Sequence, residues 1–119
     1  MGLDTSHDCW TGAYSGFLRW RKKVCEVAGY GDIMERQGFG GNKEWPEDPL
    51  SILLSHSDCD GEIEHKDCYP IAIRLEELLP GLKAAGEGGG HIGDYAEKTQ
   101  KFIDGLRLAA DEKENVEFY

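Results

Sequence analysis

The segment His56-Ser-Asp-Cys-Asp-Gly-Glu-Ile-Glu-His-Lys-Asp67 concentrates carboxylates, imidazoles and a thiol in one short stretch. A twelve-residue calcium loop places oxygen ligands at positions one, three, five, nine and twelve, a glycine at six and an apolar residue at eight. Counting from His56, the matching residues are Asp58, Asp60, Gly61, Ile63, Glu64 and Asp67. The match is imperfect, because the first ligand is a histidine and the last is not the expected bidentate glutamate. The spacing supports a calcium-site hypothesis with these ligands: His56, Asp58, Asp60, Glu64 and Asp67.

The same segment also offers a set of ligands for zinc. The pairs His56-x-x-Cys59 and His65-x-x-Cys68 supply two imidazoles and two thiolates, a combination that tetrahedral zinc accepts. Only five residues separate the two pairs, which is fewer than a zinc finger normally uses. Zinc is therefore the second metal hypothesis, behind calcium.

A purely structural interpretation of this segment requires no metal. Asp58, Asp60 and Gly61 are residue types that favour a tight turn, and Asp67 can cap the helix that follows. A helix before the segment and another after it would then hold the acidic loop as a rigid bend. The sequence leaves the metal and the turn interpretations open.

Cys9 is the strongest candidate for a nucleophile, because it lies beside His7 near an expected helix N-terminus. A reactive thiolate needs a neighbouring imidazole and an oxyanion hole, and the fold decides whether these neighbours are present. A buried cysteine more often serves as a small core residue. The chain also contains no nucleophile-elbow pattern, so we assign no catalytic residue and expect a non-enzymatic protein.

One basic cluster, Arg19-Trp-Arg-Lys-Lys23, interrupts an otherwise acidic chain. Trp20 lies off the expected apolar stripe, so it could stack on a base while Arg19 and Arg21 pair with phosphates. A solvated charged face that neutralises acidic loops is the alternative. The segment 88–93, which contains His91, precedes a helix whose backbone N–H groups could hold an anion, although a linker is the simpler interpretation.

A first helix is expected over residues 6–28, with Asp8 in its first turn, where a negative charge complements the helix dipole. Apolar residues recur along it at helical spacing: Trp10, Ala13, Tyr14, Phe17, Leu18, Val24 and Ala28. The glycine-rich segment 29–47 forms a long loop, and its length predicts a short helical turn near residues 32–37.

Three further helices are expected from their caps and prolines. Asp48 caps a short helix over residues 49–55. Pro70 lies in the first turn of a third helix, which weakens near Pro80. Asp94 caps a fourth helix with one apolar and one charged side.

A glycine hinge at 86–90 separates the last two helices, and the apolar tail 116–119 docks on the bundle or on a partner. No internal repeat divides the chain. We therefore expect one mainly α domain over residues 1–119. It is a compact, irregular four-helix arrangement with a long glycine-rich loop and a helix–acidic loop–helix centre.

Length and charge argue against several classes of protein. The chain has 119 residues and a net charge of −10, whereas proteins that bind nucleic acid polymers need a basic surface. No run approaches the roughly 20 apolar residues of a membrane span. Four cysteines without a signal peptide predict free thiols and a cytoplasmic protein.

Three groups of segments, spread over most of the chain, carry a likeness to known proteins. They are Leu3-Asp-Thr-Ser-His-Asp-Cys-Trp10 with Gly12-Ala-Tyr-Ser15, then His56-Ser-Asp-Cys-Asp-Gly-Glu-Ile63, and His91-Ile-Gly93 with Phe102-Ile-Asp-Gly-Leu-Arg107. These segments resemble a family of small proteins encoded by bacteriophages and prophages, which has no established activity. The resemblance implies a cytoplasmic accessory or counter-defence role, such as capture of a host nucleotide signal or of a host protein.

The leading hypothesis is a non-enzymatic, phage-derived accessory protein that binds a host small molecule, such as a nucleotide signal, or a host protein. Small helical chains often complete their cores by association, so a homo-oligomer is also expected. The expected ligand-binding residues are Asp4, His7, Asp8, Trp10, Arg19, Trp20, Arg21 and His91. The alternative is a calcium- or zinc-binding helix–loop–helix module centred on residues 56–68.

Overall fold

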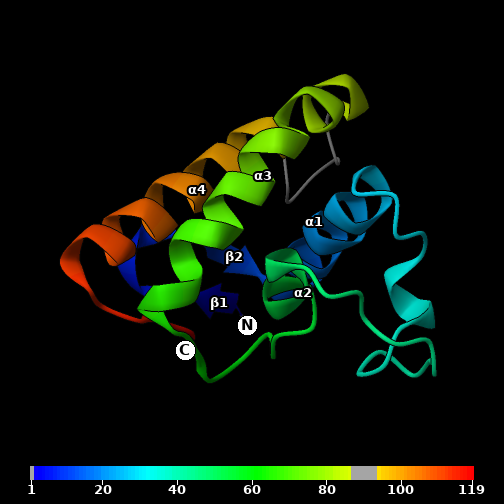
Figure 1. The fold of residues 1–119 in the computed structure, drawn as a ribbon, viewed down its shortest axis with the longest axis horizontal. Helices are drawn as coiled ribbons and strands as arrows, with labels where there is room; N and C mark the ends of the chain where they lie inside the picture. Colours follow the sequence, from blue (N-terminus) through cyan, green and yellow to red (C-terminus); the bar gives the residue numbers. More distant parts are fainter. Residues whose placement is uncertain (1, 87–93) are drawn as a thin grey trace.

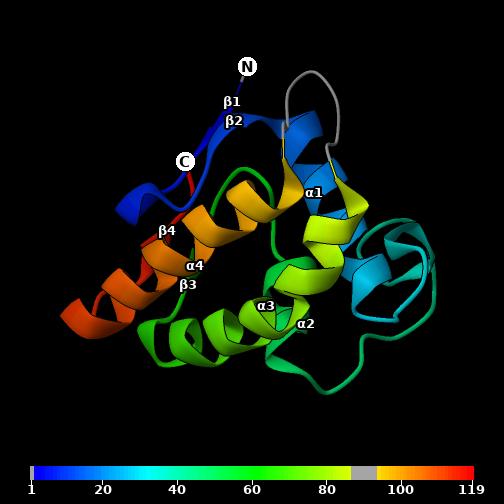
Figure 2. The same ribbon diagram turned by 90° about the horizontal axis from the view of Figure 1, so that it is seen from above.

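Two long helices, α3 and α4, lie side by side along most of their length (Figure 1, Figure 2). The computed structural model describes residues 2–86 and 94–119, and the shorter helices α1 and α2 pack against the long pair. The helix bounds are α1 Tyr14–Val27, α2 Pro49–Leu54, α3 His65–Ala85 and α4 Tyr95–Glu112. The expectation of a compact, mainly helical chain with four helices is confirmed for the described residues. None of these helices has the length and apolarity needed to cross a membrane.

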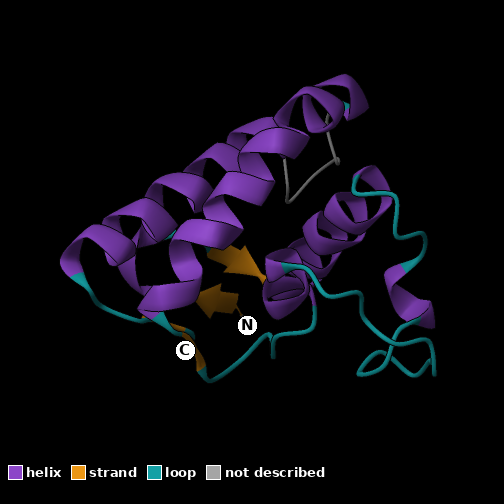
Figure 3. Cartoon of the chain, in the orientation of Figure 1, coloured by secondary structure: helices purple, strands orange, loops and turns teal. Residues whose placement is uncertain are grey.

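Two small antiparallel sheets lie beside the chain ends (Figure 3). Their strands are β1 Gly2–Asp4 paired with β2 Thr11–Ala13, and β3 Glu62–Ile63 paired with β4 Val116–Glu117. Beyond β4, the N–H of Phe118 donates to the carbonyl of Gly61 at 2.9 Å, and Tyr119 exchanges two hydrogen bonds of 2.9 Å with Asp4. The tail therefore docks on its own chain, where it joins the N-terminal hairpin to the residues before α3.

The first helix begins at Tyr14 and not at Ser6, so this predicted boundary is wrong. The preceding residues form the β1–β2 hairpin, which Thr5 closes. Its hydroxyl accepts from the N–H of Trp10 at 2.9 Å, and its own N–H donates to the Trp10 carbonyl at 3.1 Å. The hairpin buries Leu3 and Trp10 completely. Tertiary burial of this kind outweighs a weak local preference for helix.

The third helix begins earlier and ends later than predicted, because it runs from His65 through both Pro70 and Pro80. Each proline removes one backbone hydrogen bond. One face of the helix compensates by burying Ile71, Ala72, Leu75, Leu78 and Leu82. Residues 65–67 therefore belong to a helix and residues 62–63 to a strand, and the acidic loop is shorter than expected.

Aromatic rings fill the centre of the molecule: Trp10, Phe17, Trp20, Phe102 and Phe118. Trp20 was expected on the exposed side of the first helix, but it is fully buried. Its ring stacks on Phe102 with the centroids 4.8 Å apart, and its indole N–H donates to the Thr99 hydroxyl at 2.8 Å. Trp20 shares the buried face of α1 with Phe17, three residues before it, which is helical spacing.

Apolar residues of α2 and the tail are buried within the chain: Leu50, Leu53, Leu54, Val116 and Phe118. They serve the chain's own core. Large apolar side chains that stay exposed among the described residues are Met34, Ile52, Tyr69, Ile73, Leu108 and Tyr119. The homo-oligomer stays a prediction.

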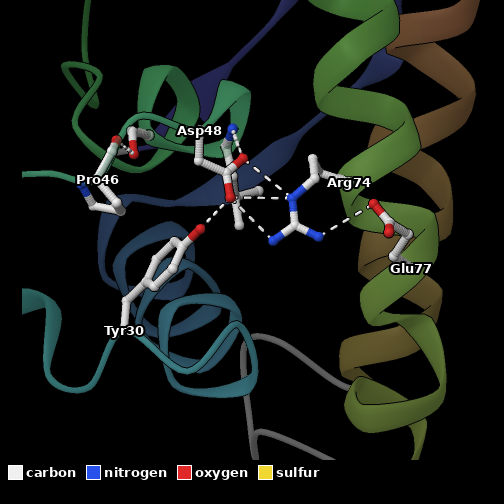
Figure 4. A network of polar contacts seen from close by, with 7 residues as sticks. Tyr30, Pro46, Asp48, Arg74 and Glu77 are labelled. Atoms are coloured by element: carbon white, nitrogen blue, oxygen red, sulfur yellow. Dashed lines mark hydrogen bonds and ion pairs between the residues drawn. The ribbon is translucent and has the colours of Figure 1, made fainter.

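Asp48 begins α2 and ties it to α3 (Figure 4). Its carboxylate accepts from the N–H of Leu50 at 2.9 Å, from Arg74 Nε at 3.1 Å to each oxygen, and from the Tyr30 hydroxyl. Burial alone would raise the pKa of Asp48, but the hydrogen bonds from Arg74 and Tyr30 outweigh it and hold the pKa below its ordinary value. The predicted cap is confirmed, as is the Asp94 cap of α4.

The segment between α1 and α2 contains the expected helical turn, at Ile33–Glu35. Arg36 fixes the rest of this segment, since its Nη1 donates to the Glu44 carbonyl at 2.5 Å and its Nη2 to the Tyr30 carbonyl at 2.7 Å. The segment then brings Phe39 against the core. In this way a long loop contributes one wall of the cavity described next.

Candidate functional site

A cavity of about 340 Å³ lies where α1, the loop before α2 and the residues after α2 meet. We name it the Arg21 pocket, and its lining residues are Leu18, Arg21, Gly38, Phe39, Ser55, His56, Ser57 and Asp58. Its volume is at the lower end of the range for small-molecule sites, about 300–1,000 Å³. Three segments that are distant in the sequence are needed to form it.

The Arg21 guanidinium is buried at this pocket, with only 2% of the residue exposed. It lies between two aromatic rings, 4.4 Å from the centroid of Phe17 and 5.3 Å from that of Phe39. Cation–π contacts of this kind are favourable. They supply no negative charge, however, and no described carboxylate forms an ion pair with Arg21.

Hydrogen bonds to described residues occupy one end of the Arg21 guanidinium. Nη1 donates to the carbonyls of Leu54 at 3.3 Å and His56 at 2.5 Å, at the end of α2, where the helix dipole favours a cation. Nε is buried without a partner, and Nη2 makes no hydrogen bond within the described residues. Nε and Nη2 form the edge that binds a carboxylate or phosphate with two parallel hydrogen bonds.

Burial lowers the pKa of Arg21 to about 10, against the opposing effect of the Asp58 charge. The guanidinium therefore stays protonated at neutral pH. Buried charges in proteins are normally paired, because an isolated charge in a low-dielectric interior is costly. An anion bound at the Nε–Nη2 edge of Arg21 would pair this charge.

Arg36 provides an internal comparison, because it is also buried and also has an Nε without a partner. Both of its terminal nitrogens donate to backbone carbonyls of its own loop, and it does not line the Arg21 pocket. Arg36 is thus a structural brace. Arg21 differs because its Nη2 makes no hydrogen bond with the described residues and the residue lines a cavity.

His56 and Asp58 form the wall that follows α2. The His56 ring is held in place, with Nδ1 2.8 Å from the Ser57 carbonyl, Nε2 3.1 Å from the Glu62 carbonyl and its centroid 4.2 Å from that of Phe118. Asp58 is half-buried. Its side chain makes no hydrogen bond or ion pair with the described residues, so both it and the edge of Arg21 are available.

A second constellation joins His7 to the end of α4, and we name it the His7 cluster: His7, Glu112 and Glu114. Its ligand atoms all lie within 4.8 Å of one another. His7 Nε2 is 2.9 Å from Glu114, and Nδ1 is 2.8 Å from the Ser6 hydroxyl, which orients the ring. An imidazole and two carboxylates are suitable ligands for zinc and similar divalent cations.

A close approach between the hairpin and α4 positions the His7 cluster. A side chain at Gly105 would bring its Cβ to 2.5 Å from Cys9 Sγ and 2.7 Å from the His7 carbonyl, so only glycine fits here. His7 itself has a left-handed backbone, with φ at 59°. Beside the cluster lies a polar cavity of about 520 Å³, which is also lined by Glu62 and Glu117.

The structure does not bring the predicted calcium ligands together as one group. His56 and Asp58 line the Arg21 pocket, Asp60 is exposed, Glu64 is the residue before α3, and Asp67 lies in its first turn. Because α3 begins at His65, Asp67 belongs to the helix and Glu64 to its N-terminal boundary, so neither lies in the loop with Asp58 and Asp60. Among the described residues, the group with metal-binding geometry is the His7 cluster.

The predicted zinc ligands are also dispersed. Cys59 and His65 are exposed, while the Cys68 thiol is buried and donates to the Glu64 carbonyl at 3.4 Å. Burial raises the pKa of Cys68 to about 11, so the thiolate that zinc needs is disfavoured at neutral pH. The same cause raises the pKa of the candidate nucleophile Cys9 to about 12.

The predicted ligand-binding residues reach different places. Trp10 and Trp20 are core residues, so neither presents an exposed ring to a ligand, and the prediction that Trp20 stacks on one is wrong. Asp4, Asp8 and Arg19 are exposed and line neither the Arg21 pocket nor the cavity beside the His7 cluster. His7 and Arg21 each belong to a site, but to separate ones. His91 lies outside the described residues.

No family model, curated protein or solved structure matches this chain. Sequence reasoning had selected Arg21, His56 and Asp58, but it did not place them in one pocket. It missed Phe39, which no local pattern connects with α1. It also missed Glu112 and Glu114, which are more than a hundred positions from His7.

Proposed function

We propose that this chain is a non-enzymatic binding protein for a small anionic molecule and that the Arg21 pocket is its binding site. One observation carries the proposal: a buried guanidinium belongs to a residue that lines a cavity, and its Nε and Nη2 have no hydrogen-bond partner among the described residues. A bound carboxylate or phosphate group would pair with this charge through charge-assisted hydrogen bonds. The protein would then hold its ligand chiefly through Arg21.

The shape of the site favours a small ligand. Its volume of about 340 Å³ suits a compound with few heavy atoms, and Trp10 and Trp20 are buried in the core, where they cannot stack on a base. A nucleotide could place one phosphate group here with its base outside. In keeping with the phage resemblance, we propose capture of a small host metabolite in the cytoplasm, with a counter-defence role if that metabolite is a signal.

Thermal unfolding in the presence of defined anions tests this function. The probes are inorganic phosphate, acetate, and linear and cyclic nucleotides, at constant ionic strength. A ligand that binds only the folded chain raises the melting temperature by mass action. We expect at least one probe to do so for the natural chain, and Arg21→Gln to remove the shift.

Arg19→Gln is the matched control, because it removes the same charge from an exposed position on the same helix. It should leave the shift unchanged. Arg21→Lys keeps the charge but lacks the bidentate edge, so it should weaken binding about tenfold or more. No response to any probe, or an equal response in Arg21→Gln, would refute the proposed function.

A second candidate function, binding of a divalent transition metal, is favoured by the convergence of the His7 cluster ligands within 4.8 Å. Calorimetric titration with Zn²⁺ and Ni²⁺ should give one site per chain, and His7→Gln and Glu114→Gln should each weaken it. His65→Gln is the matched control, because His65 is exposed and outside the cluster. Binding that survives both cluster substitutions would remove this candidate.

A further inference from the structure

Asp58 shares the Arg21 pocket with the guanidinium but does not pair with it. Both residues line the cavity, and Asp58 is half-buried. Its charge is near enough to raise the pKa of Arg21, although burial lowers that pKa by more. The cavity therefore presents one cationic and one anionic group, and within the described residues neither is neutralised by an ion pair.

Each of these two charged residues is held by contacts of its own. Arg21 is anchored through Nη1 to two carbonyls and through its plane to the rings of Phe17 and Phe39. On the other side, the turn that carries Asp58 is fixed by the Ser57 hydroxyl, which accepts from the N–H of Cys59 at 3.3 Å. These contacts position the guanidinium and the backbone of the Asp58 turn independently of each other.

We infer, on the basis of the proposed function, that the Arg21 pocket selects small zwitterions of the α-amino acid type. The ligand carboxylate would bind the free edge of Arg21, and the ligand ammonium group would face Asp58. Asp58 is then the specificity-determining residue of the site. Leu18 and Phe39 supply apolar lining for a short side chain.

Electrostatics distinguish a zwitterion from a simple anion in this pocket. A lone carboxylate on Arg21 would lie near the Asp58 charge, and repulsion between like charges is strong where water is partly excluded. An ammonium group on the same ligand turns that repulsion into attraction. Matching both charges is also how a small site rejects ligands that lack one of them.

Isothermal titration of matched ligands tests the inference on the unmodified chain. A first screen uses the common amino acids, each beside the carboxylate that lacks its amino group, for example leucine and 4-methylpentanoate. We expect the amino acid to bind about tenfold more tightly than its partner, or better. The corresponding amine without a carboxylate, 3-methylbutylamine in this example, should bind weakly.

Two substitutions assign the preference to a residue. Asp58→Asn should abolish the advantage of the amino acid and tighten binding of the simple carboxylate. Asp60→Asn is the matched control, because Asp60 lies two residues away, is exposed and does not line the pocket. It should keep the advantage. If Asp58→Asn does not fold, the comparison of matched ligands on the unmodified chain still tests the inference.

The outcomes separate the two proposals. If simple carboxylates or phosphate bind but amino acids bind no better, and Asp58→Asn tightens all of them equally, the zwitterion inference is overturned while the proposed function stands. If no carboxylate, amino acid or phosphate binds, the proposed function fails and the inference fails with it. Tighter binding of an amino acid that depends on both Arg21 and Asp58 supports both.

Discussion

The Arg21 pocket holds a buried cation that forms no ion pair with the described residues, whereas the His7 cluster holds two exposed carboxylates beside one imidazole. Water screens the charges of the His7 cluster, so grouping them costs little. The guanidinium of Arg21 has lost most of its water and has gained two carbonyls and two aromatic faces in return. An unpaired charge is therefore a stronger indication of a binding site in the buried Arg21 pocket than in the exposed His7 cluster.

The two regions also differ in what holds them. The Arg21 pocket depends on the position of α2, because the Leu54 and His56 carbonyls at its end anchor the guanidinium. The His7 cluster depends on the contact of the N-terminal hairpin with α4, on the side of the molecule where the termini lie. Substitutions in one region should therefore leave the other intact.

The largest effect is expected at Asp48, which fixes α2 to α3. Asp48→Ala should destabilise the chain by about 2–4 kcal/mol, because it removes a helix cap and a partly buried ion pair. Asp48→Asn keeps the cap and should cost less. Urea unfolding measures both, and Zn²⁺ binding at the His7 cluster should persist in each folded variant.

The contribution of Asp48 should also depend on pH. Since its pKa in the folded chain lies below its ordinary value of 3.8, the stabilisation is complete above that value and is lost as pH falls through the folded-state pKa. The stability difference between the natural chain and Asp48→Asn should therefore shrink below pH 3.8. Glu47→Gln is the neighbouring control, and an equal pH dependence in its difference would contradict this assignment.

An intermediate effect compares the two buried arginines directly. Arg21→Met and Arg36→Met each release two backbone carbonyls, so each should cost about 2 kcal/mol in unfolding free energy. Their effects on anion binding should differ, because Arg21 lines the Arg21 pocket and Arg36 does not. Loss of binding in both variants at a temperature where both are folded would break the distinction drawn between them.

The smallest effect is expected beside the His7 cluster, where Glu62 and Glu117 are directly opposite each other in the β3–β4 pair. Like charges at such positions repel, so Glu62→Gln should raise stability by about 0.5 kcal/mol. The gain should vanish in 1 M salt, since the Debye length there is only about 3 Å. A gain that is insensitive to salt would point to packing and not to charge.

Local signals in the sequence were sufficient for the features that local chemistry decides. Asp48 and Asp94 both cap helices as predicted, because a cap needs only its own side chain and the next backbone N–H groups. The start of α1 was wrong because Thr5 and Trp10 close a hairpin whose benefit lies in burial against α4. No pattern within the segment reports that benefit.

Only part of the candidate site could be predicted from the sequence. Arg21 follows Phe17 by four residues and precedes Val24 by three, a helical spacing that could have placed it on the buried face of α1. That spacing also predicts the burial of Trp20. The apolar face expected for a helix over residues 6–28 did not include it. The convergence of His7 with Glu112 and Glu114 has no such signal, since only the packed hairpin brings them together.

Gly105 reverses the usual rule for the middle of a helix, where alanine is more stable than glycine by about 1 kcal/mol. Here the first carbon of any side chain would collide with Cys9 and the His7 carbonyl. In a library of natural or random variants, position 105 should thus be as intolerant as a residue that contacts ligand. A conserved glycine there would indicate the close contact between the N-terminal hairpin and α4, and should not be mistaken for part of a binding motif.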